Sequence, residues 1–382
     1  RLTKKIYPEF FRQSNKLLDC NNLKIGFISS FLRDHSIAKT HKNWILKLDK
    51  KIFKIFVYYL EDIIFDETTN SIKKHVNYFF NGRNIKKIIQ QISRDDLDII
   101  LHLDIGMDCN SQILGSLRLA PIQCLAMGHP VTSGFDNIDY VLSSELMEPK
   151  NGQDHYTEQL INLPNTGQCY ELPILKNLGN QNSTYKKDKI IFLIPQSLFK
   201  LLPRSDHIYI DIVKKYPKSQ FWFINGVSEI ITNEFKNRVM NCFKKNNLQG
   251  EKYIFFHPRV EQNKFFDLIS KADIILDSFD WSGNNTSHEA ISLDKPIVTL
   301  PAQFMRGRHT YSILKILGIK ETIAFSEEEY VDIAVRLAKD NEFRNIIVNK
   351  IKKNKHKLFN DPKPIKFLED FLKKKAKNYR LN

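Results

Sequence analysis

The chain has 382 residues, 42% of them hydrophobic, and carries a formal net charge of +15. This length is enough for two domains that each bury a core, and it excludes a small scaffold held together by disulfides or metal. No stretch approaches the ~20 consecutive apolar residues of a membrane-spanning helix, and the first residues lack the apolar core of a signal peptide, so we expect a soluble protein without a membrane span.

The cysteines are odd in number and scattered along the chain, without any C-x-x-C pair. Neither a disulfide framework nor a zinc site is indicated, and we therefore expect a reducing, cytoplasmic environment. The five residues are Cys20, Cys109, Cys124, Cys169 and Cys242.

Much of the positive charge lies in lysine runs at residues 186–187, 352–357 and 373–375. Clustered lysines can mark a surface for nucleic acid or for an acidic membrane. Runs of this kind ordinarily lie in loops or on the solvent face of helices, and no nucleic-acid-binding motif accompanies them here. We therefore expect no nucleic-acid partner, and a non-catalytic basic binding module stays open only as an alternative.

Along the first half, short apolar runs alternate with longer amphipathic ones. Strands separated by segments of helix length predict parallel β-α-β units. The predicted strands lie at residues 23–29, 53–60, 76–79, 97–103, 121–125 and 138–142, with a helix near 39–48.

A polar stretch near residues 171–188 precedes a second alternation of the same kind, and the end of the chain has helical periodicity. The strands expected in the second half lie at residues 189–195, 220–224, 253–256, 273–277, 296–300 and 322–324. The predicted domains are an N-terminal Rossmann-like domain (1–175), a C-terminal Rossmann-like domain (186–345) and a basic helical tail (346–382). We therefore expect an α/β chain in which two Rossmann-like domains face a cleft and bind ligands where their strands end.

The most informative segment, SGNNTSHEA at residues 282–290, follows an apolar strand and opens a helix. Unpaired amides at a helix start, the positive end of the helix dipole and the hydroxyls of Thr286 and Ser287 suit a phosphate or a diphosphate. Glu289, one turn further on, is placed to reach the ribose hydroxyls of the same nucleotide. The same residues also fit an ordinary helix cap, and the local pattern leaves both interpretations open.

Neither half carries G-x-G-x-x-G or G-x-x-x-x-G-K-[ST], which disfavours dinucleotide oxidoreduction and P-loop hydrolysis. Six other segments are informative together, at residues 25–37 (IGFISSFLRDHSI), 105–108 (IGMD), 117–124 (LRLAPIQC), 128–134 (GHPVTSG), 138–140 (IDY) and 304–308 (FMRGR). Together they resemble the O-GlcNAc transferase (SPINDLY-type) family of glycosyltransferases, and they are also similar to the bacterial adhesin N-glucosyltransferases. The resemblance covers roughly residues 23–345. It implies a GT-B fold, a UDP-sugar donor, inversion at the anomeric carbon, protein acceptors, and no metal or other cofactor.

Within this resemblance, His35 lies where the family has its first active-site histidine, and a neutral imidazole there would hold a sugar hydroxyl or orient the acceptor. Asp108 takes the position of an active-site histidine in the adhesin enzymes, where a carboxylate would act as the base or orient the nucleophile. Asp104 is a rival for that role. His129, in a Gly-His-Pro loop, is expected to face the sugar. Each of these residues also fits a turn or a helix cap.

On the donor side, Lys200 matches the family lysine that contacts the donor diphosphate, where a fixed cation would stabilise the leaving group. Gln196 and Ser197 are expected to assist it. Val260 is expected to offer backbone hydrogen bonds to uracil, with Phe265 stacking nearby.

The expected diphosphate cradle is Asn285, Thr286 and Ser287, with Glu289 on the ribose. The animal enzymes differ here, because they have a histidine before paired threonines and an aspartate where Glu289 stands. Arg306 and Arg308, in the FMRGR segment, fit two roles equally, as cations of the cleft or as braces of their loop.

The sequence therefore predicts an inverting, metal-independent glycosyltransferase that moves a sugar from a UDP-sugar to a protein or peptide. The simplest version transfers N-acetylglucosamine to Ser or Thr. The nearest alternative is transfer of glucose to Asn, which the Gly-Met-Asp and Gly-His-Pro-Val-Thr segments favour because they look more like the adhesin enzymes.

Overall fold

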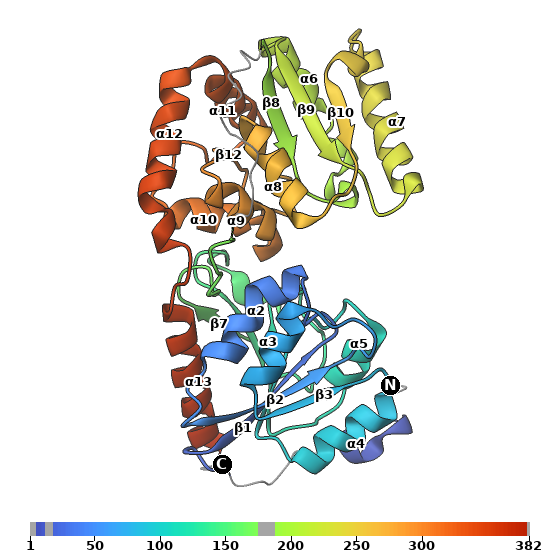
Figure 1. Ribbon diagram of the computed structural model, residues 1–382, viewed down its shortest axis with the longest axis vertical. Helices are drawn as coiled ribbons and strands as arrows, with labels where there is room; N and C mark the ends of the chain where they lie inside the picture. The colour runs from blue at the N-terminus through green and yellow to red at the C-terminus, as the bar shows by residue number, and fades with distance from the viewer. Residues whose placement is uncertain (1–4, 12–17, 175–187, 380–382) are drawn as a thin grey trace. The chain divides into compact units, whose positions relative to one another are not determined.

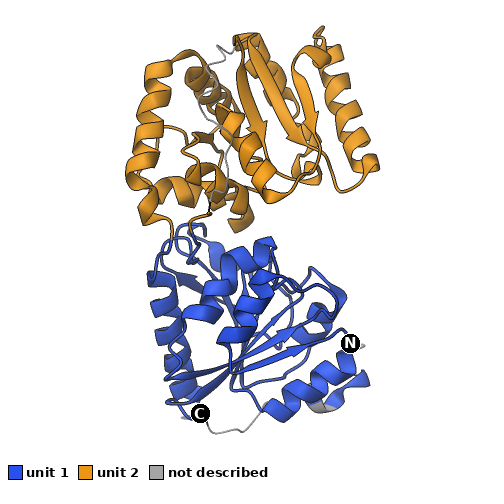
Figure 2. Ribbon diagram, viewed as in Figure 1, with its two compact units in different colours: residues 1–171, 360–382 blue, residues 172–359 orange. Residues whose placement is uncertain are grey.

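The computed structural model describes residues 5–11, 18–174 and 188–379, and it divides the chain into two compact units (Figure 2). Unit 1 comprises residues 1–171 and 360–382, and unit 2 comprises residues 172–359. The predicted linker near 171–188 falls where the chain passes from unit 1 to unit 2. Most of that linker, with the lysine pair at 186–187, lies outside the described residues.

Unit 1 is built on a parallel sheet of seven strands in the order β3-β2-β1-β4-β5-β6-β7 (Figure 1). The strands are β1 (Leu23–Ser29), β2 (Phe53–Tyr59), β3 (Tyr78–Asn81), β4 (Ile99–His102), β5 (Ile122–Ala126), β6 (Tyr140–Ser144) and β7 (Gln159–Leu163). The six strands predicted in this half are confirmed, with shifted ends. β7 was not predicted, because Gln159 and Asn162 interrupt the apolar pattern of this edge strand.

Helices cover both faces of this sheet, which explains why its central strands are almost wholly apolar. The helices are α2 (Ser36–Lys47), α3 (Glu67–His75), α4 (Ile85–Asp95), α5 (Cys109–Gly115) and α13 (Lys363–Tyr379), with short 3₁₀ turns η1 (Pro8–Phe11) and η2 (Gly152–His155). One apolar cluster joins the sheet to α2, α3 and α13, and a second joins it to α4 and α5.

Unit 2 has a parallel sheet of five strands in the order β10-β9-β8-β11-β12. Its strands are β8 (Ile190–Ile194), β9 (Ser219–Ile224), β10 (Ile254–His257), β11 (Ile274–Leu276) and β12 (Ile297–Val298). The segment predicted as a strand at 322–324 contributes only an isolated bridge between Thr299 and Ile323. In both sheets the order reverses beside the first strand, so the two α/β halves predicted from the sequence are confirmed.

The helices of unit 2 connect these strands and close the unit. They are α6 (His207–Lys215), α7 (Glu229–Lys245), α8 (Gln262–Lys271), α9 (Asn285–Ser292), α10 (His309–Ile316), α11 (Glu327–Lys339) and α12 (Asn341–Asn354). Short 3₁₀ turns are η3 (Leu198–Lys200), η4 (Pro203–Ser205), η5 (Gly250–Lys252), η6 (Met305–Gly307) and η7 (Lys355–Lys357). Among the described residues, no helix has the length and apolar content needed to span a bilayer.

The predicted tail, residues 346–382, is divided between the two units. Its first part continues α12 in unit 2, whereas α13 packs against α2 and β7 of unit 1 (Figure 1). The Asn360 amide donates to the Tyr170 carbonyl at 2.7 Å, and Glu369 accepts from the Asp49 amide at 2.7 Å. The apolar face of α13 enters the unit 1 core through Ile365, Leu368, Phe371, Leu372 and Ala376.

Candidate active site

In unit 2, one buried carboxylate organises the loop between β11 and α9. Asp277 is 3% exposed, and its Oδ1 accepts from the Gly283 amide at 2.7 Å and from Gln196 Nε2 at 3.0 Å. Its Oδ2 accepts from the hydroxyls of Ser282 at 2.6 Å and Thr299 at 2.7 Å. Burial raises the pKa of Asp277, and these hydrogen bonds oppose the rise. Four donors from three segments thereby satisfy the buried carboxylate and join those segments.

Gly283 lies where three polar side chains converge. A Cβ at this position would lie 2.5 Å from Thr286 Oγ1, 2.8 Å from Gln196 Nε2 and 2.8 Å from Ser287 Oγ. Such contacts are too short for any side chain, so glycine is needed for this close approach. The structure therefore brings together three of the residues predicted to hold the donor.

The helix that follows does not use Thr286 or Ser287 as its cap. Asn284 is the N-cap of α9, and its side chain makes no capping hydrogen bond. The Ser287 hydroxyl instead bonds to the Thr310 hydroxyl at 2.7 Å. The ordinary capping interpretation is therefore wrong for both residues. Amides in the first turn of a helix without a side-chain cap are suited to an anion.

A second helix supports the same loop. Thr310, in the first turn of α10, donates its amide to Ser282 Oγ at 2.9 Å and its hydroxyl to the Gly283 carbonyl at 3.1 Å. The Ser282 amide in turn donates to the Arg306 carbonyl at 2.9 Å. The loop from Ser282 to Ser287 is thus held from β11, from α10 and from the segment after β12.

Lys200 ends the turn η3, directly after β8. Its Nζ lies 5.2 Å from the centroid of the Trp281 ring, in the loop after β11. Burial lowers the pKa of Lys200, and the nearby Asp277 carboxylate opposes the shift. A cation that has already lost part of its water gains more from a bound anion than a fully solvated one does. β8 and β11 are neighbours at the switch point of the sheet, where ligands of such folds bind.

The other residues predicted for the donor side lie further apart. Glu289 is buried in α9, and Ser197 immediately precedes η3. Val260 lies in the loop between β10 and α8, and Phe265 lies half-buried in α8. β10 is three strands from β11, about 14 Å at the usual strand spacing, so only an extended ligand would touch both groups.

Arg306 and Arg308, to which the sequence assigned the same two possible roles, have different surroundings in the structure. Arg308 donates from Nη1 to the Ala302 carbonyl at 3.2 Å, and its guanidinium lies 4.7 Å from the Tyr311 ring centroid, as expected of a loop brace. The Arg306 guanidinium lies 4.4 Å from the Phe304 ring centroid and 5.8 Å from that of Trp281.

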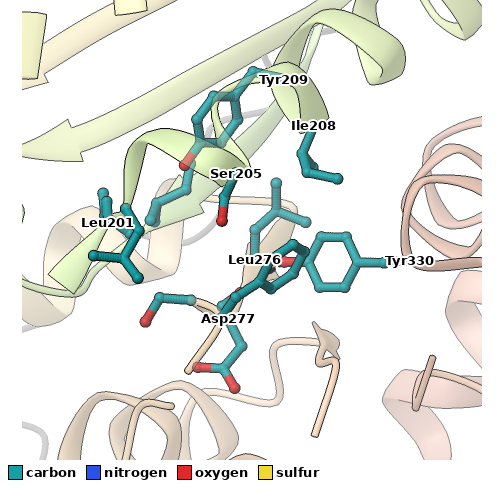
Figure 3. A pocket seen from close by; sticks show the side chains of 11 residues that line it. Leu201, Ser205, Ile208, Tyr209, Leu276, Asp277 and Tyr330 are labelled. Carbon is teal, nitrogen blue, oxygen red and sulfur yellow. Dashed lines mark hydrogen bonds between the residues drawn. The ribbon is translucent and has the colours of Figure 1, made fainter. Parts of the chain in front are cut away.

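A small cavity lies beside the donor loop, and Figure 3 shows Asp277 and Tyr330 among the side chains that line it. The Tyr330 hydroxyl donates to the Asp277 carbonyl at 2.9 Å. The volume of about 20 Å³ suits one water molecule rather than a sugar, so this cavity is not the predicted site. Its lining is Ile194, Leu201, Leu202, Ser205, Ile208, Tyr209, Leu276, Asp277, Ser278, Phe279 and Tyr330.

In unit 1, the switch point between β1 and β4 holds two carboxylates. Asp104 is fully buried, and its Oδ2 accepts from Ser29 Oγ at 2.7 Å and from the Ser30 amide at 3.1 Å. Its Oδ1 has no hydrogen-bond partner among the described residues. Burial, aided by the charge of Asp108, raises the pKa of Asp104 to about 7. This carboxyl therefore titrates near neutral pH.

Asp108 is the N-cap of α5. Its Oδ1 accepts from the amides of Asn110 at 2.8 Å and Ser111 at 3.0 Å, and its Oδ2 accepts from Ser30 Oγ at 2.6 Å. Both oxygens are therefore engaged, and Ser30 connects Asp108 to Asp104. The pKa of Asp104, about 7, suits a base, whereas Asp108 is the more exposed of the two carboxylates.

His35 is the N-cap of α2. Its Nδ1 accepts from the Ile37 amide at 3.3 Å, and its ring stacks on Phe31 with the centroids 4.4 Å apart. Burial and the charge of Arg33 lower the pKa of His35 to about 4, so the imidazole is neutral at pH 7. Because Nδ1 accepts, the proton is on Nε2.

His129, after β5, lies against the loop that carries the two carboxylates. A Cβ on Gly106 would lie 2.9 Å from His129 Cδ2, and Gly106 has a φ of +96°, which favours glycine. The structure therefore brings His129 next to the loop of Asp104 and Asp108. Among the described residues, no group of three or more His, Cys, Asp or Glu side chains is arranged to hold a metal ion.

Asp277, Trp281 and Thr310 belong to the donor-side loop or its supports and were not predicted from the sequence. An aspartate directly after the buried run of β11 was a usable signal for the first of these, because polar side chains at the ends of parallel strands gather at a ligand site. Thr310 gave no such signal, since it follows Ser282 by 28 positions and meets it only in the folded unit.

The chain is similar in sequence to known glycosyltransferases. The chain matches Glycosyl transferase family 41 over residues 2–171 and 175–364. It is 25% identical over 344 residues to a probable UDP-N-acetylglucosamine–peptide N-acetylglucosaminyltransferase SPINDLY of Solanum lycopersicum, covering 88% of this chain and 36% of that protein. It is 25% identical over 345 residues to the UDP-glucose:protein N-beta-glucosyltransferase of Actinobacillus pleuropneumoniae, covering 84% of this chain and 51% of that protein.

Among solved structures, an O-GlcNAc transferase of Thermobaculum terrenum superposes with a TM-score of 0.84 at 19% identity, covering 99% of this chain and 73% of the other. This likeness shows the fold, which is of the predicted GT-B class. The chain spans about a third of the length of the SPINDLY relative that it matches. The resemblance found in the sequence is confirmed by these matches.

Proposed function

The chain belongs to Glycosyl transferase family 41, and from this premise we propose that it transfers a sugar from a UDP-sugar to a protein side chain. The observation that carries the proposal is the donor-side loop of unit 2. Gln196, Gly283, Thr286 and Ser287 converge there at the start of α9, next to the strand that leads to Lys200. Amides, hydroxyls and a partly desolvated cation are the groups that stabilise a departing diphosphate.

The proposed donor is UDP-N-acetylglucosamine and the proposed acceptor is a peptide, as the name of the SPINDLY relative suggests. Within that peptide, the proposed acceptor side chain is the hydroxyl of Ser or Thr. Asn285, Thr286, Ser287 and Lys200 would hold the diphosphate, with Glu289 on the ribose and Val260 and Phe265 at the base. We propose inversion and independence of metal ions, because Lys200 and the α9 amides would balance the leaving-group charge.

The proposed acceptor-side residues are His35, His129 and Asp108 of unit 1. A neutral imidazole with its proton on Nε2, as at His35, can donate to a sugar or acceptor oxygen. Asp108 would act as the base or orient the acceptor, and Asp104, with a pKa of about 7, is its rival for the role of base. Ser30 connects the two carboxylates, because its amide donates to Asp104 and its hydroxyl donates to Asp108.

Glucose transfer to Asn is the second candidate, and the Actinobacillus relative is the observation that favours it. Intact-peptide mass spectrometry separates the two proposals after reaction with each UDP-sugar. N-acetylhexosamine on Ser or Thr supports the first, whereas a hexose on Asn supports the second and contradicts the first. We place the reaction in a reducing compartment, because all five cysteines are unbridged.

Thermal unfolding with UDP, UDP-N-acetylglucosamine, UDP-glucose and GDP-fucose tests the donor site directly. A ligand that binds only the folded protein raises its unfolding temperature. We expect UDP species to stabilise the protein with or without EDTA, and we expect Lys200→Ala to lose most of that effect. If no nucleotide stabilises the protein, and RNA binds in a salt-dependent way instead, the basic binding module becomes the better account.

A further inference from the structure

Two cations in unit 2 share one aromatic ring. Lys200 Nζ lies 5.2 Å from the centroid of the Trp281 ring, and the Arg306 guanidinium carbon lies 5.8 Å from the same centroid. These residues come from three separate loops, after β8, β11 and β12, at the same edge of the sheet. An aromatic face attracts a cation, but it does not cancel the repulsion between two of them.

Neither of these cations forms an ion pair with a carboxylate of the described residues. The carboxylate whose charge acts on Lys200 is that of Asp277, and its two oxygens already accept four hydrogen bonds. Arg204, a few residues beyond Lys200, is in contrast paired with both Asp280 and Glu327. Two half-buried cations without a paired carboxylate, held near one ring, are therefore an arrangement that a bound anion would relieve.

Arg306 is also held in place toward the donor loop. Its backbone carbonyl accepts from the Ser282 amide at 2.9 Å, one residue before Gly283. Its guanidinium stacks on Phe304, with 4.4 Å to the ring centroid, which fixes the plane of its donors. A planar, oriented guanidinium matches the oxygens of a phosphate group.

We propose that Arg306 is a second cation of the donor site and that it binds the diphosphate of the UDP-sugar together with Lys200. This inference rests on the proposed function. A nucleoside diphosphate carries more negative charge than one ammonium neutralises, and the charge grows as the sugar leaves. Trp281 sets the spacing of the two cations, and Arg308 braces the loop without contacting the ligand.

The test is calorimetric titration of the full chain with UDP and, separately, with uridine. We compare the native protein with Arg306→Met, Arg306→Lys and Lys200→Met. The matched control is Arg336→Met, because the Arg336 guanidinium also stacks on an aromatic ring, with 3.8 Å to the Phe343 centroid, and its loss changes the net charge equally. Far-UV circular dichroism and thermal unfolding establish that each variant is folded.

We expect Arg306→Met to weaken UDP binding about ten- to a hundredfold, the usual range for a hydrogen bond to a charged group. Uridine binding should stay within about twofold, since the nucleoside lacks the diphosphate, and Arg306→Lys should recover part of the loss. Arg336→Met should bind UDP like the native protein. Should Arg306→Met fail to fold, Arg306→Gln, which keeps the length and removes the charge, takes its place with the same expectation.

The outcomes separate this inference from the function on which it rests. If the native protein does not bind UDP, the proposed function fails. If the native protein binds UDP and Lys200→Met weakens that binding, while Arg306→Met does not, the second-cation role is refuted and the proposed function stands. Equal losses for UDP and uridine, or a loss matched by Arg336→Met, would also refute a contact to the diphosphate.

Discussion

The carboxylate of Asp277 offers the sharpest test of how the donor loop is built, through the pair Asp277→Asn and Asp277→Ala. In the Asn variant, Oδ1 can still accept from the Gly283 amide and Gln196 Nε2. The hydroxyls of Ser282 and Thr299 can reverse and accept from the new amide, because a hydroxyl both donates and accepts. We therefore expect a loss of about 1–2 kcal/mol in the free energy of unfolding, the difference between charged and neutral hydrogen bonds.

The Ala variant leaves all four donors without their acceptor inside the protein. Breaking a buried charged network in this way costs about 3–5 kcal/mol. Because Gly283 and Ser282 lose their anchor, the start of α9 should also lose its fixed position, and UDP affinity should fall by at least about tenfold. The Asn variant should bind UDP within about threefold of the native protein.

Urea unfolding and calorimetric titration with UDP measure these two quantities on the same preparations. The reasoning is refuted if Asp277→Ala costs less than about 1 kcal/mol, since four buried donors would then have found other partners. It is equally refuted if the Ala variant is destabilised but binds UDP normally, because the network would then support the fold without positioning the donor site.

Three further predictions concern unit 1. The pKa of Asp104 is about 7 in the folded protein and 3.8 as its ordinary value. Its contribution to the free energy of unfolding is therefore present below pH 4 and is lost as the pH rises to about 7. Urea unfolding of Asp104→Asn across this pH range should not show that loss of stability. NMR should find the His35 proton on Nε2 and a pKa near 4, and a pKa above 6 would contradict its burial. Leu368→Ala should cost about 3 kcal/mol in thermal or urea unfolding, because this residue of α13 is fully buried in the unit 1 core.

The fold was predictable because most of its strands are recognisable from their own residues. β1, β4 and β5 are buried on both faces of a parallel sheet, so their sequences are nearly continuous apolar runs. β7 was missed because an edge strand is free to carry polar residues. The sequence also did not predict which unit α13 packs against. Its apolar stripe shows that the helix packs on a core, but the stripe does not identify that core.

The donor site was predictable in its local part only. The segment at 282–290 showed a loop and a helix start, and the structure brings Thr286 and Ser287 together with Gln196 around Gly283. The supports of that loop are distant in sequence, because Asp277 and Thr310 reach it from β11 and α10. Side chains that act through tertiary contacts leave no periodic pattern, and their roles become visible only when the sheet has brought the loops together.

The acceptor side shows why one residue pattern can describe both a cap and a catalytic group. Asp108 caps α5 through Asn110 and Ser111, which any aspartate before a helix can do. The same loop nevertheless holds Asp104, whose pKa of about 7 arises from burial and from the charge of Asp108. Since Ser30 donates its amide to Asp104 and its hydroxyl to Asp108, the protonation of one carboxyl acts on the cap formed by the other. A structural cap and a titrating group are thus coupled through one serine, and substitution of either aspartate should shift the pH dependence of transfer rather than only its rate.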